Sequence, residues 1–217
     1  MNYSFGNCTF PGTIKQNGDW RDHIDFDDHG APIRSLNVTL NTGNILNAVK
    51  FKLLLPETRN DLNEVLGAVL LSEMGFITPE TFQVRTVVND VETMMLFQED
   101  AQKEMLERNN RREGPIFEGD ESLLWSYKDY ETFELSELAL ARMVNKNWFL
   151  KGVSSEVISL KAYEALQKEY LRSNYGFDTR NIYPNEDRDK VFQEYFLVLL
   201  SMNGLHGLAG HNRRFYF

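Results

Sequence analysis

The apolar stretch AVKFKLLL, residues 48–55, constrains the fold of this chain more than any other segment. Its side chains alternate between two faces, as they do in a β-strand. Val49, Phe51, Leu53 and Leu55 share one face, whereas Lys50, Lys52 and Leu54 share the other. Pro56 ends the strand because proline cannot donate to a sheet ladder. The segment therefore predicts a strand with one apolar face and two lysines on the opposite face.

The segments on either side of this strand predict a β-rich region with one helix. Residues 60–75 carry apolar side chains at helical spacing, and we expect these to face inward: Leu62, Val65, Leu66, Val69 and Leu70. Two strands, 80–88 and 91–99, follow and are joined by a hairpin turn at Asn89-Asp90. Before residue 48, Asn17-Gly18 predicts a tight hairpin, and 36–40 predicts another strand that turns at Gly43-Asn44. The acidic segment 22–30 lacks the spacing of an EF-hand loop and is interpreted as a solvated hairpin tip.

After residue 99 the pattern becomes helical. We expect a short helix capped by Asp100, a polar loop over 111–122, and helices over 135–144, 154–175 and 187–202. The helix over 154–175, capped by Ser154 or Ser155, has an apolar stripe that we expect to be buried: Val157, Leu160, Tyr163, Leu166 and Tyr170. A β-rich first part followed by a helical second part is an α+β arrangement. We expect one domain made of residues 1–99 and 100–217, with a hinge near 99–115.

Composition and charge exclude several classes of function. The formal net charge of -9 argues against nucleic-acid binding, which needs clustered Lys and Arg. No apolar run approaches the ~20 residues of a membrane span, and the N-terminal segment is not a signal peptide. The single cysteine, Cys8, excludes an internal disulfide, and we expect it to be a small buried residue. The compartment and the oligomeric state stay open.

Several quoted strings resemble the CotH kinase family, which is named for a spore-coat protein. They are KFKLLLPETRNDLNEVLGAVLLSEMGFITPETFQV at 50–84, NDVETMMLFQEDAQKEMLERNNRREGPIFEGDE at 89–121, and the terminal GLHGLAGHNRRFYF. The resemblance covers about residues 10–217. It implies an atypical protein-kinase-like fold, with a β-rich N-terminal lobe containing one helix and a mainly helical C-terminal lobe. It also implies an ATP- and Mg²⁺-dependent enzyme that transfers the γ-phosphate to Ser or Thr hydroxyls of a protein substrate.

Phosphoryl transfer needs a cation near the phosphates and a carboxylate that pairs with that cation. Under the resemblance, Lys52 is the first candidate for the cation and Lys50 the second; the alternative is that both coat a solvated sheet surface. Glu64 is the candidate carboxylate, with Glu73 as a second possibility. The spacing from Asp61 to Glu64 also fits a capping box, which would explain Glu64 without a ligand.

Two further candidates lie where the family's hairpin ends. Gln98 and Glu99 are expected to line the nucleotide site, close to where adenine would meet hinge backbone; an ordinary strand-to-helix junction is the alternative. The segment RNNRREG at 108–114 is a small basic patch, and we interpret it as an exposed polar loop.

The terminal segment HGLAGHNRRFYF, residues 206–217, resembles the catalytic-loop region of the family. There His206 and His211 are candidates for accepting a hydroxyl proton or orienting a substrate, and Asn212 is the candidate metal ligand. No aspartate lies between Met202 and Phe217, although kinases use one in this loop. The alternative function is therefore a catalytically inactive, kinase-like binding or assembly module. A zinc site at the two histidines lacks further ligands. We also expect the chain to be the front part of a longer domain, inactive as a fragment.

Overall fold

The computed structural model describes residues 2–3, 6–18, 23–27, 29–120, 140–172, 188–208 and 212–217. The chain divides into two compact units, 1–110 and 111–217, and each is described by itself. The fold is α+β, as expected: the first unit contains a five-strand antiparallel sheet with helices, and the second contains helices and a smaller sheet. No helix within the described ranges is both long enough and apolar enough to cross a membrane.

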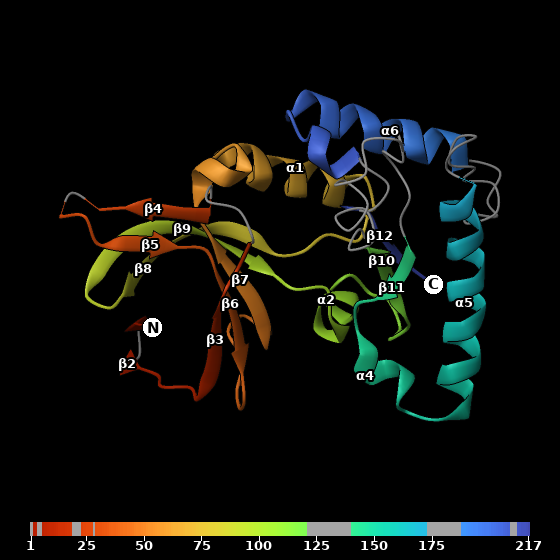
Figure 1. Ribbon diagram of the computed structural model, residues 1–217, viewed down its shortest axis with the longest axis horizontal. Helices are drawn as coiled ribbons and strands as arrows, with labels where there is room; N and C mark the ends of the chain where they lie inside the picture. The colour runs from red at the N-terminus through yellow and green to blue at the C-terminus, as the bar shows by residue number, and fades with distance from the viewer. Residues whose placement is uncertain are drawn as a thin grey trace, which may run out of the picture. The chain divides into compact units, whose positions relative to one another are not determined.

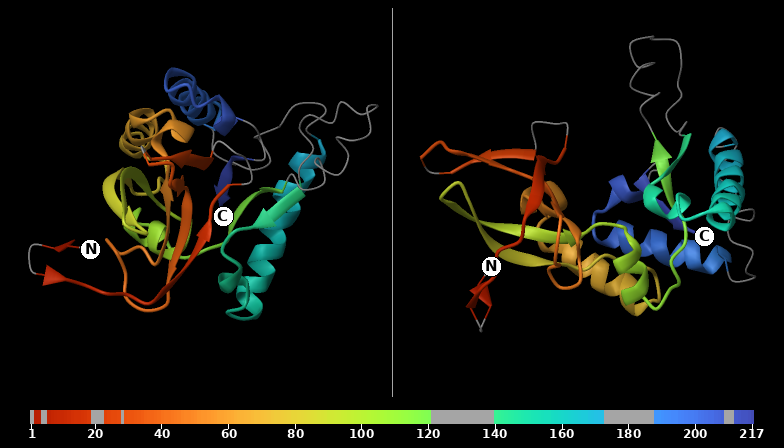
Figure 2. Two further views of the ribbon diagram at one scale, coloured as in Figure 1. Left: turned by 60° about the vertical axis from the view of Figure 1, so that its left-hand side comes forward. Right: turned by 90° about the horizontal axis from the view of Figure 1, so that it is seen from below.

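The five-strand sheet of the first unit is built from strands that neighbour one another in the order β3-β6-β7-β9-β8. Their bounds are β3 (Gly12–Gln16), β6 (Leu36–Leu40), β7 (Lys50–Leu54), β8 (Thr81–Val88) and β9 (Val91–Glu99). A short 3-10 helix, η2 (Pro56–Arg59), and helix α1 (Leu62–Glu73) connect β7 to β8. Helix α1 lies along one face of the sheet, as Figures 1 and 2 show. A second helix, α2 (Lys103–Arg108), follows β9.

Two of the predicted turns are confirmed. Asn89 and Asp90 both have positive φ (50° and 65°) and join β8 to β9, in the left-handed conformation that a two-residue hairpin turn needs. Gly43, with φ of 76°, lies in the connection from β6 to β7. A Cβ atom at that position would lie 2.5 Å from the ring of Phe10, so both the backbone and the packing require glycine there.

The predicted hairpin at Asn17-Gly18 is wrong. Strand β3 pairs with β6 rather than with the segment that follows it. After Asn17 the chain leaves the sheet to form a separate hairpin, β4 (Ile24–Phe26) with β5 (Pro32–Arg34), and returns at Ser35. The Asn17 amide donates to the Ser35 carbonyl at 2.8 Å and closes the base of this arm. The described part of the acidic segment lies in this arm, where Asp27 Oδ1 accepts the backbone amides of His29 and Ala31 in the turn.

Near the N-terminus, β1 (Asn2–Tyr3) pairs with β2 (Gly6–Asn7). Cys8 directly after this pair is exposed, contrary to the expectation that it is buried.

The core of the first unit is aromatic and lies on the face of the sheet opposite to α1. The rings of Phe51 and Phe82 stack on the two sides of the Phe97 ring, at centroid distances of 4.8 and 4.7 Å. Val38 and Ile45 extend this cluster. Burial of aromatic side chains supplies much of the hydrophobic stabilisation of a domain, so this cluster holds β7, β9 and the edge strand β8 together.

Helix α1 turns a different face to the sheet than the sequence predicts. Its buried or half-buried residues are mostly small or polar: Glu64, Val65, Gly67, Ala68 and Leu71. Four of the five residues expected to be inward are exposed or at the limit of exposure: Leu62, Leu66, Val69 and Leu70. The small residues allow the helix to approach the sheet closely, and this packing outweighs the apolar periodicity of the sequence.

In its described residues the second unit contains more strand than predicted. It contains a three-strand antiparallel sheet in the order β11-β10-β12, with bounds β10 (Ile116–Asp120), β11 (Leu140–Met143) and β12 (Arg214–Tyr216). Strand β12 was expected as a strand at the chain end and is confirmed. The predicted loop over 111–122 contains β10, whose Ile116 and Phe117 are buried. The predicted helix over 135–144 is a strand over 140–143, and residues 135–139 lie outside the described residues.

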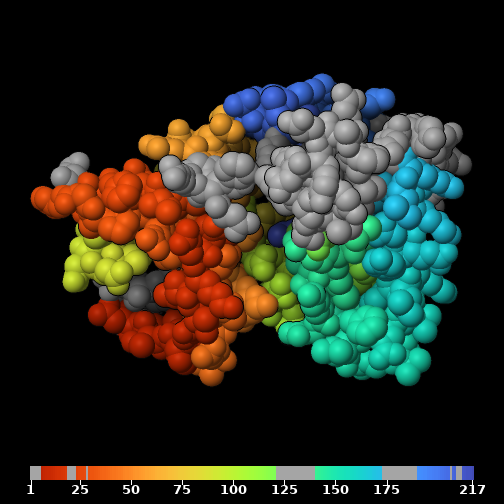
Figure 3. Space-filling model, in the orientation of Figure 1, coloured from red at the N-terminus to blue at the C-terminus, as the bar shows by residue number. Residues whose placement is uncertain are grey.

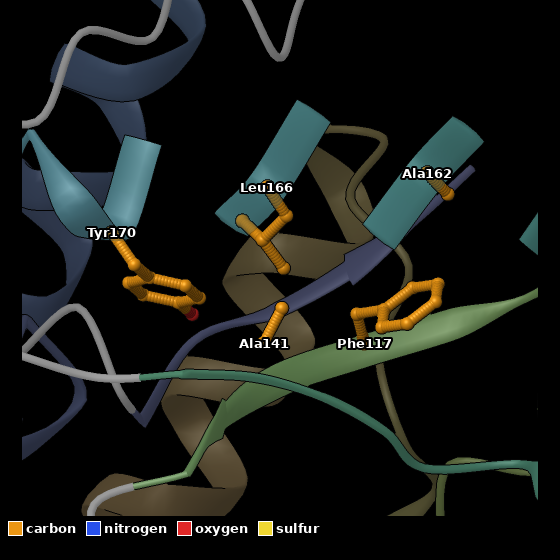
Figure 4. Packing of buried hydrophobic residues seen from close by; sticks show 5 residues of the cluster. All are labelled: Phe117, Ala141, Ala162, Leu166 and Tyr170. Carbon is orange, nitrogen blue, oxygen red and sulfur yellow. The ribbon is translucent and has the colours of Figure 1, made fainter. Parts of the chain in front are cut away.

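The described residues of this unit form the helices α4 (Lys146–Phe149), α5 (Val153–Leu171) and α6 (Arg188–Ser201), followed by the 3-10 helix η5 (Leu205–Leu208). Helix α5 starts one residue before the predicted cap, after Gly152 rather than at a serine. It covers one face of the three-strand sheet, where Leu166 and Tyr170 pack against Phe117 and Ala141 (Figure 4). Only part of the predicted stripe is buried, since Val157, Leu160 and Tyr163 are exposed. Helix α6 follows its predicted range; Val198 is buried, and Phe196 and Leu200 are exposed.

Candidate functional site

Five polar side chains line up across the five-strand sheet and form its main chemical feature. Directly opposed residues of antiparallel strands point to the same face of a sheet. The register places Lys52 opposite Asn37 on one side and opposite Gln98 on the other. Continuing outward, it gives what we call the polar row: Lys15, Asn37, Lys52, Gln98 and Thr81. The row lies on the α1 face, away from the aromatic core.

Glu64 of α1 joins this row through a hydrogen bond. The Gln98 side-chain amide donates to Glu64 Oε1 at 2.6 Å. The capping explanation for Glu64 is not realised, because Asp61 has φ of 54° and makes no side-chain cap hydrogen bond. The structure therefore brings three of the predicted nucleotide-site residues together: Lys52, Gln98 and Glu64.

The surroundings of this group are apolar on one side. Leu54 and Leu96 lie opposite each other on the same face as Lys52 and Gln98, two residues further along their strands, and both are fully buried. Lys50 also shares this face and lies opposite Thr39, two residues from Lys52 on the other side. A lysine beside a buried apolar surface is in an environment of reduced dielectric, where its charge interacts more strongly with an anion.

Glu99 points to the other face of the sheet and is separated from the polar row. It lies opposite Phe51, is only 4% exposed, and forms an ion pair with Arg108 of α2. Its Oε2 also accepts the Glu80 amide at 3.2 Å. Arg108 in turn contacts the Glu80 carboxylate at 3.2 Å and donates to the Thr78 carbonyl at 3.2 Å. Through these contacts Glu99 links α2 and the start of β8 to the end of β9.

The backbone just after β9 is also fixed. The Glu99 amide donates to the Glu80 carbonyl at 2.9 Å, and the Asp100 amide donates to the Lys50 carbonyl at 3.0 Å. Asp100 does not cap the helix: α2 starts after Gln102 without a side-chain cap, and the Gln102 side chain is 3.4 Å from Asp100 Oδ2.

The predicted residues of the terminal segment belong to the second unit. His206 lies in η5, Asn212 is exposed just before β12, and His211 lies outside the described residues. The segment is anchored on α6, because the Tyr195 hydroxyl donates to the Gly207 carbonyl at 3.3 Å. Arg213 donates to the Leu208 carbonyl, and its guanidinium lies 4.9 Å from the centre of the Phe196 ring. Burial raises the pKa of Tyr195 above its usual value, so this hydroxyl stays protonated as a donor.

No metal centre is formed by the residues that the structure describes: no group of three or more His, Cys, Asp or Glu side chains could hold an ion. The prediction of Asn212 as a metal ligand therefore stays a prediction.

Sequence reasoning missed the charged network around Arg108, which it treated as part of an exposed basic loop. Arg108 and Asn109 instead hold Thr78: Asn109 donates to the Thr78 carbonyl at 3.1 Å, and its Oδ1 is 3.4 Å from the Thr78 amide. These contacts span about thirty residues of chain, and no local pattern reports them. In addition, Glu118 of β10 pairs with Arg142 at 2.7 Å and Arg214 at 3.0 Å, an arrangement that we call the arginine ladder.

Comparison with known proteins adds no family assignment, because no protein-family model matches the chain and no curated protein matches it either.

Proposed function

We propose that the chain is a kinase-like nucleotide-binding protein of the CotH type, and that Lys52 binds the phosphates of ATP. The activity that follows is transfer of the γ-phosphate to Ser or Thr hydroxyls of a protein substrate. The single observation that carries the proposal is the group of Lys52, Gln98 and Glu64 on one face of the five-strand sheet.

The position of this group in the chain supports a kinase-like role. Protein kinases carry their phosphate-binding lysine on the third strand of the N-terminal sheet and the partner glutamate on the helix that follows. In this chain β7 is the third strand of the five-strand sheet in sequence order, and α1 follows it. Lys52 lies on β7 and Glu64 lies in the first turn of α1.

Each residue of the group has a defined part in binding. The Lys52 ammonium would hold a phosphate oxygen, and the hydrogen bond from Gln98 keeps the Glu64 carboxylate at the sheet surface. The Glu99–Arg108 pair acts indirectly, since it fixes the end of β9 on which Gln98 lies. When bound, ATP would supply the phosphoryl group.

The magnesium ion of the proposal depends on a different residue from the nucleotide. Asn212 is the one predicted metal residue, it is exposed, and the described residues around it form no metal-binding group. The proposal therefore rests on the nucleotide, and the need for Mg²⁺ is a separate question for experiment.

Calorimetric titration of the full 217-residue chain with ATP, with and without Mg²⁺, tests the nucleotide site. Lys52→Ala is expected to weaken ATP binding at least about tenfold, because a charge-assisted phosphate contact is lost. Lys15→Ala is the matched control, since Lys15 lies in the same polar row on the outer strand β3. Equal affinities for the Lys52→Ala variant and the unmodified chain would remove Lys52 from the site. A loss with Lys50→Ala instead would move the site two residues along β7.

The alternative is a kinase-like module that binds nucleotide without transferring phosphate. The absence of aspartate between Met202 and Phe217 favours it, because kinases use an aspartate in the catalytic loop. Transfer of labelled phosphate from ATP to a generic protein substrate distinguishes the two. Binding without transfer supports the module, and transfer that is lost in Lys52→Ala supports the enzyme.

A further inference from the structure

Helix α5 has two different faces, and only one of them packs on the described residues of the second unit. The buried face packs on the three-strand sheet through Ala162, Leu166 and Tyr170. Val153, Val157 and Leu160 lie on the opposite side and are 74%, 46% and 59% exposed. We call these three residues the α5 stripe. The helix forms part of the surface seen in Figure 3.

The spacing of the α5 stripe matches the seam of a coiled coil. Val153, Val157 and Leu160 are separated by four and then three residues, which is the alternation of the d and a positions of a heptad. The same alternation continues through Glu164, Gln167 and Leu171, of which only Leu171 is apolar. The apolar seam therefore occupies the first half of the helix and becomes polar in the second half.

Two opposite charges flank the apolar half. In the same heptad numbering, Glu156 is a g position and Lys161 is the e position five residues later. In a parallel pair of helices, the g residue of one copy faces the e residue of the other. Neither Glu156 nor Lys161 forms an ion pair with any other residue in the described ranges. Two copies in parallel would thus form two Glu156–Lys161 pairs between them.

We propose that the α5 stripe is a self-association surface, on which α5 of a second copy of this chain packs in parallel. An antiparallel pairing places e positions against e positions, which brings Lys161 and Lys168 of one copy towards those of the other. The e and g charges therefore favour the parallel arrangement, and the two Glu164 carboxylates, which face each other at the a position, weaken it. This inference is independent of the proposed nucleotide site.

The polar half of the helix limits the strength of the contact. Glu164 lies at an a position and pairs with Lys168 at 2.6 Å, and the Gln167 side chain accepts the Ala141 amide at 2.8 Å. A polar residue at a core position fixes the register at a cost in stability. Each copy contributes the three apolar residues of the α5 stripe, so the buried area of the interface is small for a specific contact. We therefore expect a dissociation constant of about 1–100 μM.

Sedimentation equilibrium of the full chain, at concentrations up to about 300 μM, measures this association. Leu160→Asp is expected to weaken the dimer at least about tenfold, because it places a charge in the seam. Ile158→Asp is the matched control, since Ile158 is exposed on the same helix but lies outside the seam. A chain that stays monomeric over the whole range, or equal effects of the two variants, would overturn the proposal.

Charge reversal tests the parallel register and does not alter the apolar residues. Glu156→Lys and Lys161→Glu are each expected to weaken the dimer about threefold to tenfold, and the double reversal to restore it. Glu164→Leu is expected to strengthen it at least about tenfold by extending the apolar seam. If the double reversal is no better than the single ones, the two helices do not pack in this register and the proposal fails.

Discussion

The five-strand sheet and the three-strand sheet each carry a line of polar residues across their strands, but the two lines differ in how their charges are balanced. In the arginine ladder, Glu118 on the central strand is paired with an arginine on each neighbouring strand. The polar row contains two lysines and no carboxylate from the sheet itself. Its carboxylate, Glu64, comes from a helix and reaches the row through Gln98. The same cross-strand register therefore gives a structural contact in one sheet and a candidate anion site in the other.

The largest expected effect tests whether the polar row depends on the aromatic core beneath it. Phe97→Ala removes the central ring of the stack and is expected to lower the free energy of unfolding by about 3–5 kcal/mol. ATP affinity should fall as well, because Phe97 lies on β9 next to Gln98. Urea denaturation and calorimetry measure the two effects. Leu166→Ala, in the core of the second unit, should cost about 2–5 kcal/mol while the folded protein keeps its ATP affinity.

Within the five-strand sheet, neutralising a buried charge should lower the free energy of unfolding more than neutralising an exposed one. Glu99→Gln leaves Arg108 without its buried partner and is expected to cost about 2 kcal/mol, reduced from the fully buried case because Arg108 is partly exposed. The control is Glu92→Gln in the exposed Arg85–Glu92 pair, which should cost less than about 0.5 kcal/mol. The denaturant midpoints of the two variants measure these two losses of stability, and equal midpoints would contradict the anchoring role of Glu99.

The contrast between the two polar lines is tested by one substitution in each. Glu118→Gln is expected to cost about 1 kcal/mol in stability, because both arginine partners are partly exposed, and to leave ATP affinity unchanged. Glu64→Gln should have the opposite profile, with a smaller stability change and a measurable loss of ATP affinity. If both variants change only stability, the polar row is a structural contact like the ladder.

The smallest effect concerns the anchor of the terminal segment on α6. Burial raises the pKa of Tyr195, so its contribution to stability is complete below the unfolded pKa of about 10 and is lost as the pH rises through the folded value. Tyr195→Phe removes the hydrogen bond to Gly207 and is expected to cost about 0.5–1 kcal/mol at neutral pH. It should also reduce the loss of stability above pH ~10, measured by denaturation at several pH values. Tyr163→Phe, at an exposed tyrosine, serves as the control.

The sequence predicts the elements that local patterns encode. Alternation predicts the strand over 48–55, which forms as Lys50–Leu54, and residues that adopt positive φ at low cost predict the turn at Asn89-Asp90. The family resemblance predicts Lys52, Gln98 and Glu64 as site residues. That their side chains lie close together follows from the strand register and a hydrogen bond, neither of which can be read from the sequence.

The remaining errors have a common physical cause: tertiary contacts outweigh local propensity. Leu140, Ala141 and Met143 favour helices, but they form a strand because β10 offers a pairing edge and α5 covers the sheet. The Asn17-Gly18 pair has the residues of a tight turn, although its strand pairs beyond the next hairpin. In α1 the apolar stripe predicts the wrong buried face, because the small residues Gly67 and Ala68 lie towards the sheet, and in α5 only Leu166 and Tyr170 of the predicted stripe are buried.

Because the base of the β4–β5 arm is closed, the number of residues in the arm can vary without a change in the five-strand sheet. The chain leaves the sheet at Asn17 and re-enters at Ser35, whose hydroxyl is fully buried and accepts the Leu55 amide at 3.0 Å. Because both ends are held at the same point, residues can be inserted or removed between them without shifting the register of β3 on β6. Doubling the length of a flexible loop costs only about 0.6 kcal/mol in closure entropy. The arm is therefore a natural point for evolution, or for protein engineering, to graft a recognition segment onto this sheet.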